Sequence, residues 1–181
     1  VCRLDTELPV STPTVDGGAV YVPGFDRTLY SLNASTCAVN WRFSGANAGF
    51  SANPIVTGGR VYVGSRDGSF YAITASNGAL AWSYPTGGPI MQSAAYDNGV
   101  LYFASMDMYG YAINASTGTL VWRTPQKLPG EQYSTWWPVV HGNYLVWSGS
   151  SAYKFNSSPG ALDASAEGVD YRAFFGVPTG S

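Results

Sequence analysis

The sequence predicts an all-β protein, a β-propeller built from about four four-stranded antiparallel blades. Three observations predict this fold. A segment of about 40 residues recurs along the chain, first after 41 residues and then after 40. Within each copy, short runs rich in β-branched and aromatic residues lie between turn residues. Gly (22) and Pro (11) make up about 18% of the 181 residues, against an average of about 12%, which indicates many tight turns.

Three copies of the repeat, which begin at Pro13, Pro54 and Ala94, align without a gap. Among the columns that hold the same residue in every copy, four are aromatic or acidic. These columns are Tyr21, Tyr62 and Tyr102; Asp26, Asp67 and Asp107; Tyr30, Tyr71 and Tyr111; and Trp41, Trp82 and Trp122. Chance does not plausibly produce four such columns, so residues 13–43, 54–84 and 94–124 are each predicted to form a blade.

Each copy is predicted to fold as four strands joined by three turns. The first turns carry Gly17-Gly18, Gly58-Gly59 and Asn98-Gly99, which supply the positive φ of two-residue hairpins. The third turns begin with Asn33, Thr74 and Asn114, whose side chains can bond the backbone ahead. Four short antiparallel strands in about 40 residues are the unit of a propeller blade.

The rest of the chain departs from this pattern. A degenerate fourth blade is predicted over residues 138–164, because Tyr153, Asn156, Gly160 and Leu162 match the second copy, although Ala164 stands where Trp is expected. Residues 125–137 form an insertion loop, and residues 165–181 a C-terminal extension that includes one more candidate strand. Residues 1–8 are expected to be an outer strand of a preceding or closing blade.

The number of blades in the intact assembly stays open. The chain is a fragment of a seven- or eight-bladed ring, a complete four-bladed ring, or a half that a second copy completes.

In each of the three aligned copies, a tryptophan stands four residues after the last residue of the third turn, which is Cys37, Gly78 or Gly118. An indole can lie flat on the backbone of a neighbouring blade's glycine, because no Cβ blocks the approach. The segment AINASTGTLVW, residues 112–122, resembles the tryptophan-docking motif of the quinoprotein-type, or PQQ-like, β-propeller repeats, and residues 72–82 and 31–41 fit it with departures. The structural docking residues are then Trp41, Trp82 and Trp122 with Gly78, Gly118 and Gly160.

This resemblance covers about residues 13–162 and is specific for the fold. Such repeats occur in quinone-dependent dehydrogenases and in non-catalytic scaffolds, such as the lipoprotein subunit of the outer-membrane assembly machine. The favoured interpretation is a non-catalytic scaffold or binding module that presents loops to a protein or glycan partner. The alternatives are a fragment of a PQQ-dependent dehydrogenase and a self-assembling subunit of a filament or larger complex, joined through blade edges.

No catalytic, cofactor-binding or metal-ligating residue is assigned. By analogy with the family, a dehydrogenase needs vicinal cysteines, a carboxylate base, an arginine near the quinone and a calcium held by Glu and Asn. Cys2 and Cys37 lie far apart in the sequence, so PQQ and calcium are expected only under that alternative. The three aligned aspartates are interpreted as turn residues rather than as a cation ring. The single histidine, His141, stands beside Gly142-Asn143 and is expected in a hairpin turn.

The insertion loop is the best candidate for a specific site. Its residues Glu131, Tyr133, Trp136 and Trp137 interrupt the repeat, and irregular insertions on a rigid frame often bind partners. Adjacent tryptophans stack on a sugar or anchor a protein, or they simply pack in the core.

Three sequons, at Asn33, Asn114 and Asn156, fall on the third turn of the repeat. They are candidate glycosylation sites, although the turn itself also explains an asparagine there.

Charge and hydropathy limit the partners. Nine Lys and Arg against eleven Asp and Glu give a net charge of −2, without a basic cluster, which disfavours a nucleic-acid partner. No run approaches the ~20 apolar residues that a membrane span needs. The low charge and the Ser, Thr and Gly content suit an extracellular, cell-surface or periplasmic protein, and a glycoprotein where the organism glycosylates.

The two cysteines give a testable prediction. Cys37 replaces the glycine of the first docking motif, and Cys2 lies close to where the tryptophan of a preceding copy would stand. We therefore expect a Cys2–Cys37 disulfide in place of that contact, which contributes roughly 3 to 4 kcal/mol. Reduction should add the mass of two hydrogens to the intact chain, and an unchanged mass would contradict the bridge.

Overall fold

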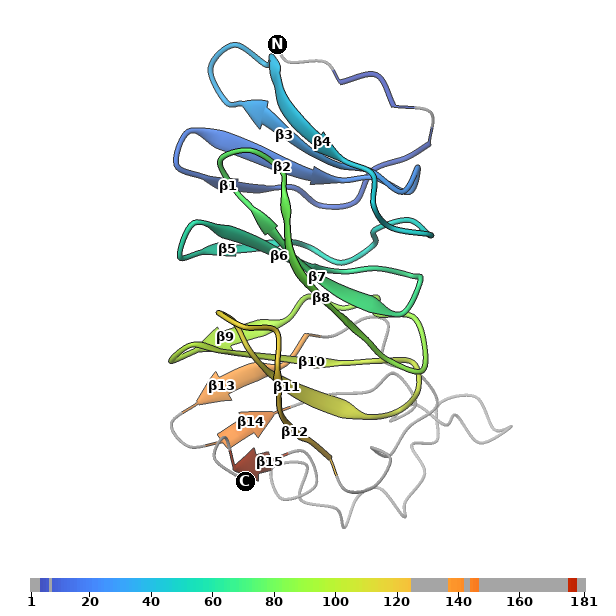
Figure 1. The fold of residues 1–181 in the computed structure, drawn as a ribbon, viewed down its shortest axis with the longest axis vertical. Helices are drawn as coiled ribbons and strands as arrows, with labels where there is room; N and C mark the ends of the chain where they lie inside the picture. Colours follow the sequence, from blue (N-terminus) through green and yellow to red (C-terminus); the bar gives the residue numbers. More distant parts are fainter. Residues whose placement is uncertain (1–3, 7, 125–136, 142–143, 147–175, 179–181) are drawn as a thin grey trace, which may run out of the picture.

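The repeats fold into antiparallel sheets that follow one another along the chain and stack face to face (Figure 1). The computed structural model describes residues 4–6, 8–124, 137–141, 144–146 and 176–178. Among these residues, no helix is long and apolar enough to cross a membrane.

Three of the sheets have four strands each, in the order of the sequence. The first holds β1 (Thr14–Asp16), β2 (Ala19–Pro23), β3 (Leu29–Asn33) and β4 (Val39–Phe43). The second holds β5 (Ile55–Thr57), β6 (Arg60–Gly64), β7 (Ser69–Thr74) and β8 (Leu80–Pro85). The third holds β9 (Ala95–Asp97), β10 (Val100–Ala104), β11 (Gly110–Asn114) and β12 (Leu120–Arg123). These sheets confirm the predicted fold class of a partial β-propeller.

The fourth sheet is described in part, and it includes a strand from the C-terminal extension. It contains β13 (Val139–His141), β14 (Tyr144–Val146) and β15 (Gly176–Pro178), with β14 in the middle. The sequence analysis places the fourth blade within residues 138–164 and assigns residues 165–181 to an extension. In the structure, β15 of that extension pairs with β14, with Leu145 opposite Val177. Strand β15 thereby supplies hydrogen-bond partners to an edge of β14 that would otherwise be open.

The N-terminal segment is also described only in part. Residues 1–8 are expected to be an outer strand, but the described residues 4–6 and 8 lie in no strand. Leu4 instead packs against Val22, Tyr30 and Leu32, on a face of the first sheet. Pro9, which follows this segment, has no N–H to donate to a strand ladder. Its carbonyl accepts a hydrogen bond from the Phe25 backbone amide at 3.0 Å.

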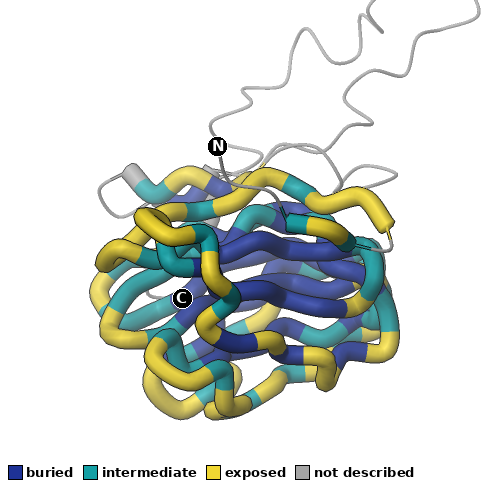
Figure 2. The backbone as a smooth tube through the Cα atoms, turned by 90° about the horizontal axis from the view of Figure 1, so that it is seen from above, coloured by how far each residue is buried: buried dark blue, intermediate teal, exposed yellow. Residues whose placement is uncertain are grey.

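The core lies between the sheets. The two middle strands of each of the first three sheets are mostly buried, whereas the outer strands β8 and β12 contain no buried residue. Figure 2 shows the buried strand segments within a rim of exposed turns. Between the second and third sheets, the rings of Phe70 and Phe103 stack with centroids 4.2 Å apart. Middle strands packed on both faces explain why their sequences are apolar without a clean alternation.

Tryptophans of β4 and β8 hold neighbouring sheets together along one side of the stack, where the third turns lie. The Trp41 indole N–H donates to the Ala75 carbonyl of the second sheet at 2.8 Å, and a Cβ on Gly78 would lie 2.8 Å from the indole ring. Trp82 repeats this arrangement on the third sheet, where its N–H donates to the Ala115 carbonyl at 3.0 Å and a Cβ on Gly118 would lie 2.6 Å from the ring. At both junctions, only a glycine leaves room for the indole.

The third tryptophan is described, but its expected partner is not. Trp122 packs against Tyr102 with ring centroids 6.0 Å apart. Gly160 lies outside the described residues, so that contact stays a prediction.

The aligned aspartates hold the opposite side of the stack, at the other ends of the strands. Asp67 lies in the turn between β6 and β7, where it accepts hydrogen bonds from the Ser69 amide and the Tyr71 hydroxyl, both at 2.8 Å. It also accepts one from the Asn47 amide at 2.8 Å, in the connector of residues 44–54 between the first and second sheets. The carboxylate therefore both shapes its own turn and ties down the connector.

The other two aspartates have similar partners. Asp107 accepts from the Tyr111 hydroxyl at 2.6 Å and from the Gly87 amide of the next connector, residues 86–94, at 2.8 Å. Asp26 accepts from the Tyr30 hydroxyl at 2.6 Å and from the Thr28 amide at 3.1 Å. These contacts favour the interpretation of the aspartates as turn residues.

The indole contact predicts the cost of a methyl group at Gly78. Gly78→Ala places a side chain at φ +74 and against the indole, so we expect about 1 to 2 kcal/mol from the backbone and a further 1 to 3 kcal/mol from overpacking. Gly58→Ala is the matched control, since Gly58 has φ +57 and nothing within 4 Å of the added Cβ. Denaturant unfolding of both variants measures the difference, and equal losses would contradict the role of the indole contact.

The aspartate turns predict an alkaline loss of stability. Burial, with the hydrogen bond to Asp67, raises the pKa of Tyr71 to about 12, whereas a free tyrosine has a pKa of about 10. The contribution of the neutral phenol is thus complete below pH ~10 and is lost as the pH rises towards ~12. The free energy of unfolding should fall less steeply in Tyr71→Phe across this window. Tyr96→Phe, on an exposed tyrosine, serves as control, and identical slopes for wild type and Tyr71→Phe would contradict the assignment.

Candidate functional site: a polar pocket before the inner strands

The sequon asparagines lie in the third turns. The side-chain oxygen of Asn33 accepts from the amides of Ser35 and Thr36, both at 2.9 Å. Asn114 does the same, at 2.9 and 3.0 Å, in the third sheet. Asn156 lies outside the described residues. The turn accounts for both described asparagines, and glycosylation stays a prediction.

Cys37 occupies the same turn of the first sheet. It has a φ of +63, in the region where the other two sheets have Gly78 and Gly118. Cys37 is disulfide-bonded, and the sequence contains one other cysteine, Cys2. Since Cys2 lies outside the described residues, the geometry of the bridge is not described.

Of the four candidate residues in the insertion loop, only Trp137 is described, because Glu131, Tyr133 and Trp136 lie outside the described residues. Trp137 stands two residues before β13 and is 56% exposed. It is not packed into the core, and its indole lines a pocket.

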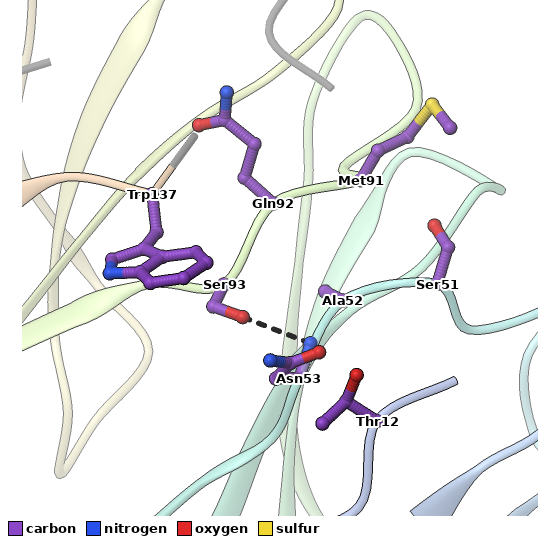
Figure 3. A pocket seen from close by; sticks show the side chains of 8 residues that line it. All are labelled: Thr12, Ser51, Ala52, Asn53, Met91, Gln92, Ser93 and Trp137. Carbon is purple, nitrogen blue, oxygen red and sulfur yellow. Dashed lines mark hydrogen bonds between the residues drawn. The ribbon is translucent and has the colours of Figure 1, made fainter. Parts of the chain in front are cut away.

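This pocket has a volume of about 210 Å³ and combines polar side chains with an indole and a thioether. Figure 3 shows Trp137 and Gln92 on one side of it, and Met91 and Ser51 on the other. Its lining residues are Thr12, Ser51, Ala52, Asn53, Met91, Gln92, Ser93 and Trp137. None of these eight side chains is charged.

The repeat explains how the pocket forms. Thr12, Asn53, Ser93 and Trp137 each stand two residues before the first strand of a sheet, so successive sheets contribute equivalent positions. Hydrogen bonds link these positions across the sheets. The backbone N–H of Asn53 donates to the Ser93 hydroxyl at 2.9 Å, and the Ser11 hydroxyl donates to the backbone carbonyl of Ser51 at 2.8 Å. The rim of the pocket is therefore a fixed part of the stack.

The pocket also collects unpaired polar atoms. Within the described part of the chain, the buried side-chain atoms without a hydrogen-bond partner are the Ser51 hydroxyl oxygen and both amide atoms of Gln92. Gln92 is only 3% exposed. Burial of an unpaired polar group costs free energy, commonly about 1 to 3 kcal/mol. Such a cost, concentrated at one pocket, is typical of a binding site.

The sequence analysis did not identify Gln92, Ser51 or Asn53. The available signal was their place in the alignment, at or just before the positions equivalent to Thr12 and Trp137. No motif marks an amide as unpaired, because that depends on what the neighbouring sheet places opposite it.

The pocket does not fit PQQ with calcium. PQQ is a tricarboxylate, and binding it calls for cationic side chains, while calcium prefers carboxylate ligands. The eight lining residues offer neither, and no group of three or more His, Cys, Asp or Glu among the described residues could hold a metal.

Comparison with known proteins now places the chain. The family model described as outer membrane protein assembly factor BamB matches residues 4–167. The crystal structure of BamB from Moraxella catarrhalis is similar, with a TM-score of 0.64 and 21% identity, over 78% of this chain and 44% of that one. The chain thus spans less than half the length of that protein. No curated protein sequence matches it significantly.

Two further solved structures share the fold. The quinohemoprotein alcohol dehydrogenase ADHIIG from Pseudomonas putida HK5 has a TM-score of 0.56 and 27% identity, over 67% of this chain and 21% of the enzyme. The computationally designed Ika4 protein has a TM-score of 0.66 and 15% identity, over 78% of this chain and 86% of its own. Together with the match over most of its length, the stacked sheets place this chain in the BamB-like family of PQQ-like β-propeller repeats.

Proposed function

We propose that this chain is a non-catalytic binding module of an exported protein. It binds its partner on the side of the stack where the first strand of each sheet begins, at β1, β5, β9 and β13. The observation that carries the proposal is the pocket, where all the unpaired buried polar side-chain atoms of the described residues gather. Elsewhere the recurring polar side chains have partners inside the fold, as Asp67 and Asn114 illustrate. An unmet hydrogen-bonding capacity at one place points to a ligand.

The frame around the pocket supports this role. Tryptophans hold one side of the stack, and aspartates bind the connectors on the other side. A binding site benefits from such rigidity, because less conformational entropy is lost when the partner binds. In this proposal Trp41, Trp82 and Trp122 are purely structural docking residues.

The relatives support a protein partner and an envelope location. The matching family is described as an outer membrane assembly factor, and this chain spans less than half of the BamB structure. We therefore place the module outside the cytoplasm, in the periplasm or at the cell surface, with Asn33 and Asn114 available to glycosylation if the organism performs it.

The test places a photoreactive residue at Thr12, on the pocket rim, in the organism that makes the protein. Leu120, an exposed residue of the outer strand β12, is the matched control position. We expect a discrete adduct with a protein or glycan from position 12 and none from position 120. Equal adducts at both positions, or adducts with further copies of the chain at position 120 alone, would overturn the proposal.

A second arm tests the enzymatic alternative. The purified chain is mixed with PQQ, calcium, a primary alcohol or an aldose, and a redox dye. We expect no dye reduction above the protein-free rate. Turnover that requires both PQQ and calcium would overturn the non-catalytic assignment.

A further inference from the structure

We infer that the pocket binds one neutral sugar ring, such as a single hexose unit of a glycan. This inference rests on the proposed function and names the chemistry of its ligand. Its basis is the unpaired amide of Gln92, the exposed indole of Trp137, and the charge and size of the cavity.

The Gln92 amide determines the hydrogen-bonding character of the ligand. Its nitrogen donates and its oxygen accepts, and neither has a partner although the residue is 3% exposed. The Ser51 hydroxyl in the same pocket is also unpaired and can do either. Two neighbouring hydroxyl groups of a sugar match a primary amide, since one accepts from the nitrogen while the other donates to the oxygen.

The indole of Trp137 supplies an apolar surface beside these polar groups. It is 56% exposed and lines the same pocket as Gln92. A pyranose ring has C–H groups on a face and hydroxyls at its edge, so it can cover an indole while its edge bonds the amide.

Charge and size narrow the choice further. None of the eight lining side chains in the described part of the chain is charged, so a buried carboxylate or phosphate would lose its hydration without an ion pair to any of them. The pocket has a volume of about 210 Å³. This is room for one ring, not for an extended chain, so a longer glycan would leave its other units outside.

The test titrates the full chain with glucose, galactose, mannose and N-acetylglucosamine as methyl glycosides. Tryptophan fluorescence and ligand-observed NMR report binding, with glucuronate and glucose 6-phosphate as charged comparators. We expect at least one neutral glycoside to bind at millimolar concentration, and the charged comparators at least tenfold more weakly. Absence of binding by every neutral glycoside, or stronger binding of a charged one, would overturn the inference.

Variants connect the binding to the named residues. Gln92→Met keeps the side-chain length and removes both amide atoms, and Trp137→Ala removes the indole; each should weaken binding at least tenfold. Leu120→Ala removes an exposed apolar side chain on the outer rim and should leave the affinity unchanged. Since the Gln92 amide is unpaired, Gln92→Met should match or exceed the wild-type denaturation midpoint. A lowered midpoint with intact sugar binding would show that Gln92 has only a structural role.

The two proposals fail separately. If the glycosides do not bind but position 12 forms an adduct with a protein, the sugar inference is wrong and the binding module stands. If neither occurs, both are wrong.

Discussion

The contact on which the stack depends is an indole lying on a glycine of the next sheet. The outer strands β8 and β12 bury none of their residues, so the edge of a sheet needs another attachment to its neighbour. Trp41 and Trp82 provide it with a flat ring and one hydrogen bond to a carbonyl. The carbonyl of Ala115 also accepts from Arg60 and Tyr62, at 3.0 and 3.1 Å, which strengthens the junction of the second and third sheets.

The two sides of the stack, which lie at opposite ends of the strands, have different roles. The indole contacts lie at the end that holds the third turns, whereas the aspartates and connectors lie at the other end. The Phe50 amide donates to the Gly24 carbonyl of the first sheet, and the Arg66 amide donates to the Gly49 carbonyl from the second. A connector bonded to both of its sheets delivers the next inner strand at a fixed place. The pocket follows from this placement, because its residues directly precede those strands.

The sequence predicted what the repeat determines. The period, the turn residues and the aligned aromatic residues led to the three four-stranded sheets. The pairing of β15 with β14 was not predicted, because strand pairing there depends on which edge is left open rather than on a local pattern. The pocket was not predicted, although Trp137, which lines it, was named as a candidate binding residue. The unpaired state of Gln92 arises from groups that neighbouring sheets fail to place opposite it, and no single repeat contains that information.

The position two residues before each inner strand differs in every copy. It holds Thr12, Asn53, Ser93 and Trp137, while the tyrosine and aspartate columns of the first three copies are constant. Under the proposed function, the residues that folding requires and those that recognise a ligand occupy separate positions of one module. An evolving lineage, or a protein engineer, could exchange these four residues one at a time and alter the preferred ligand while leaving the architecture unchanged.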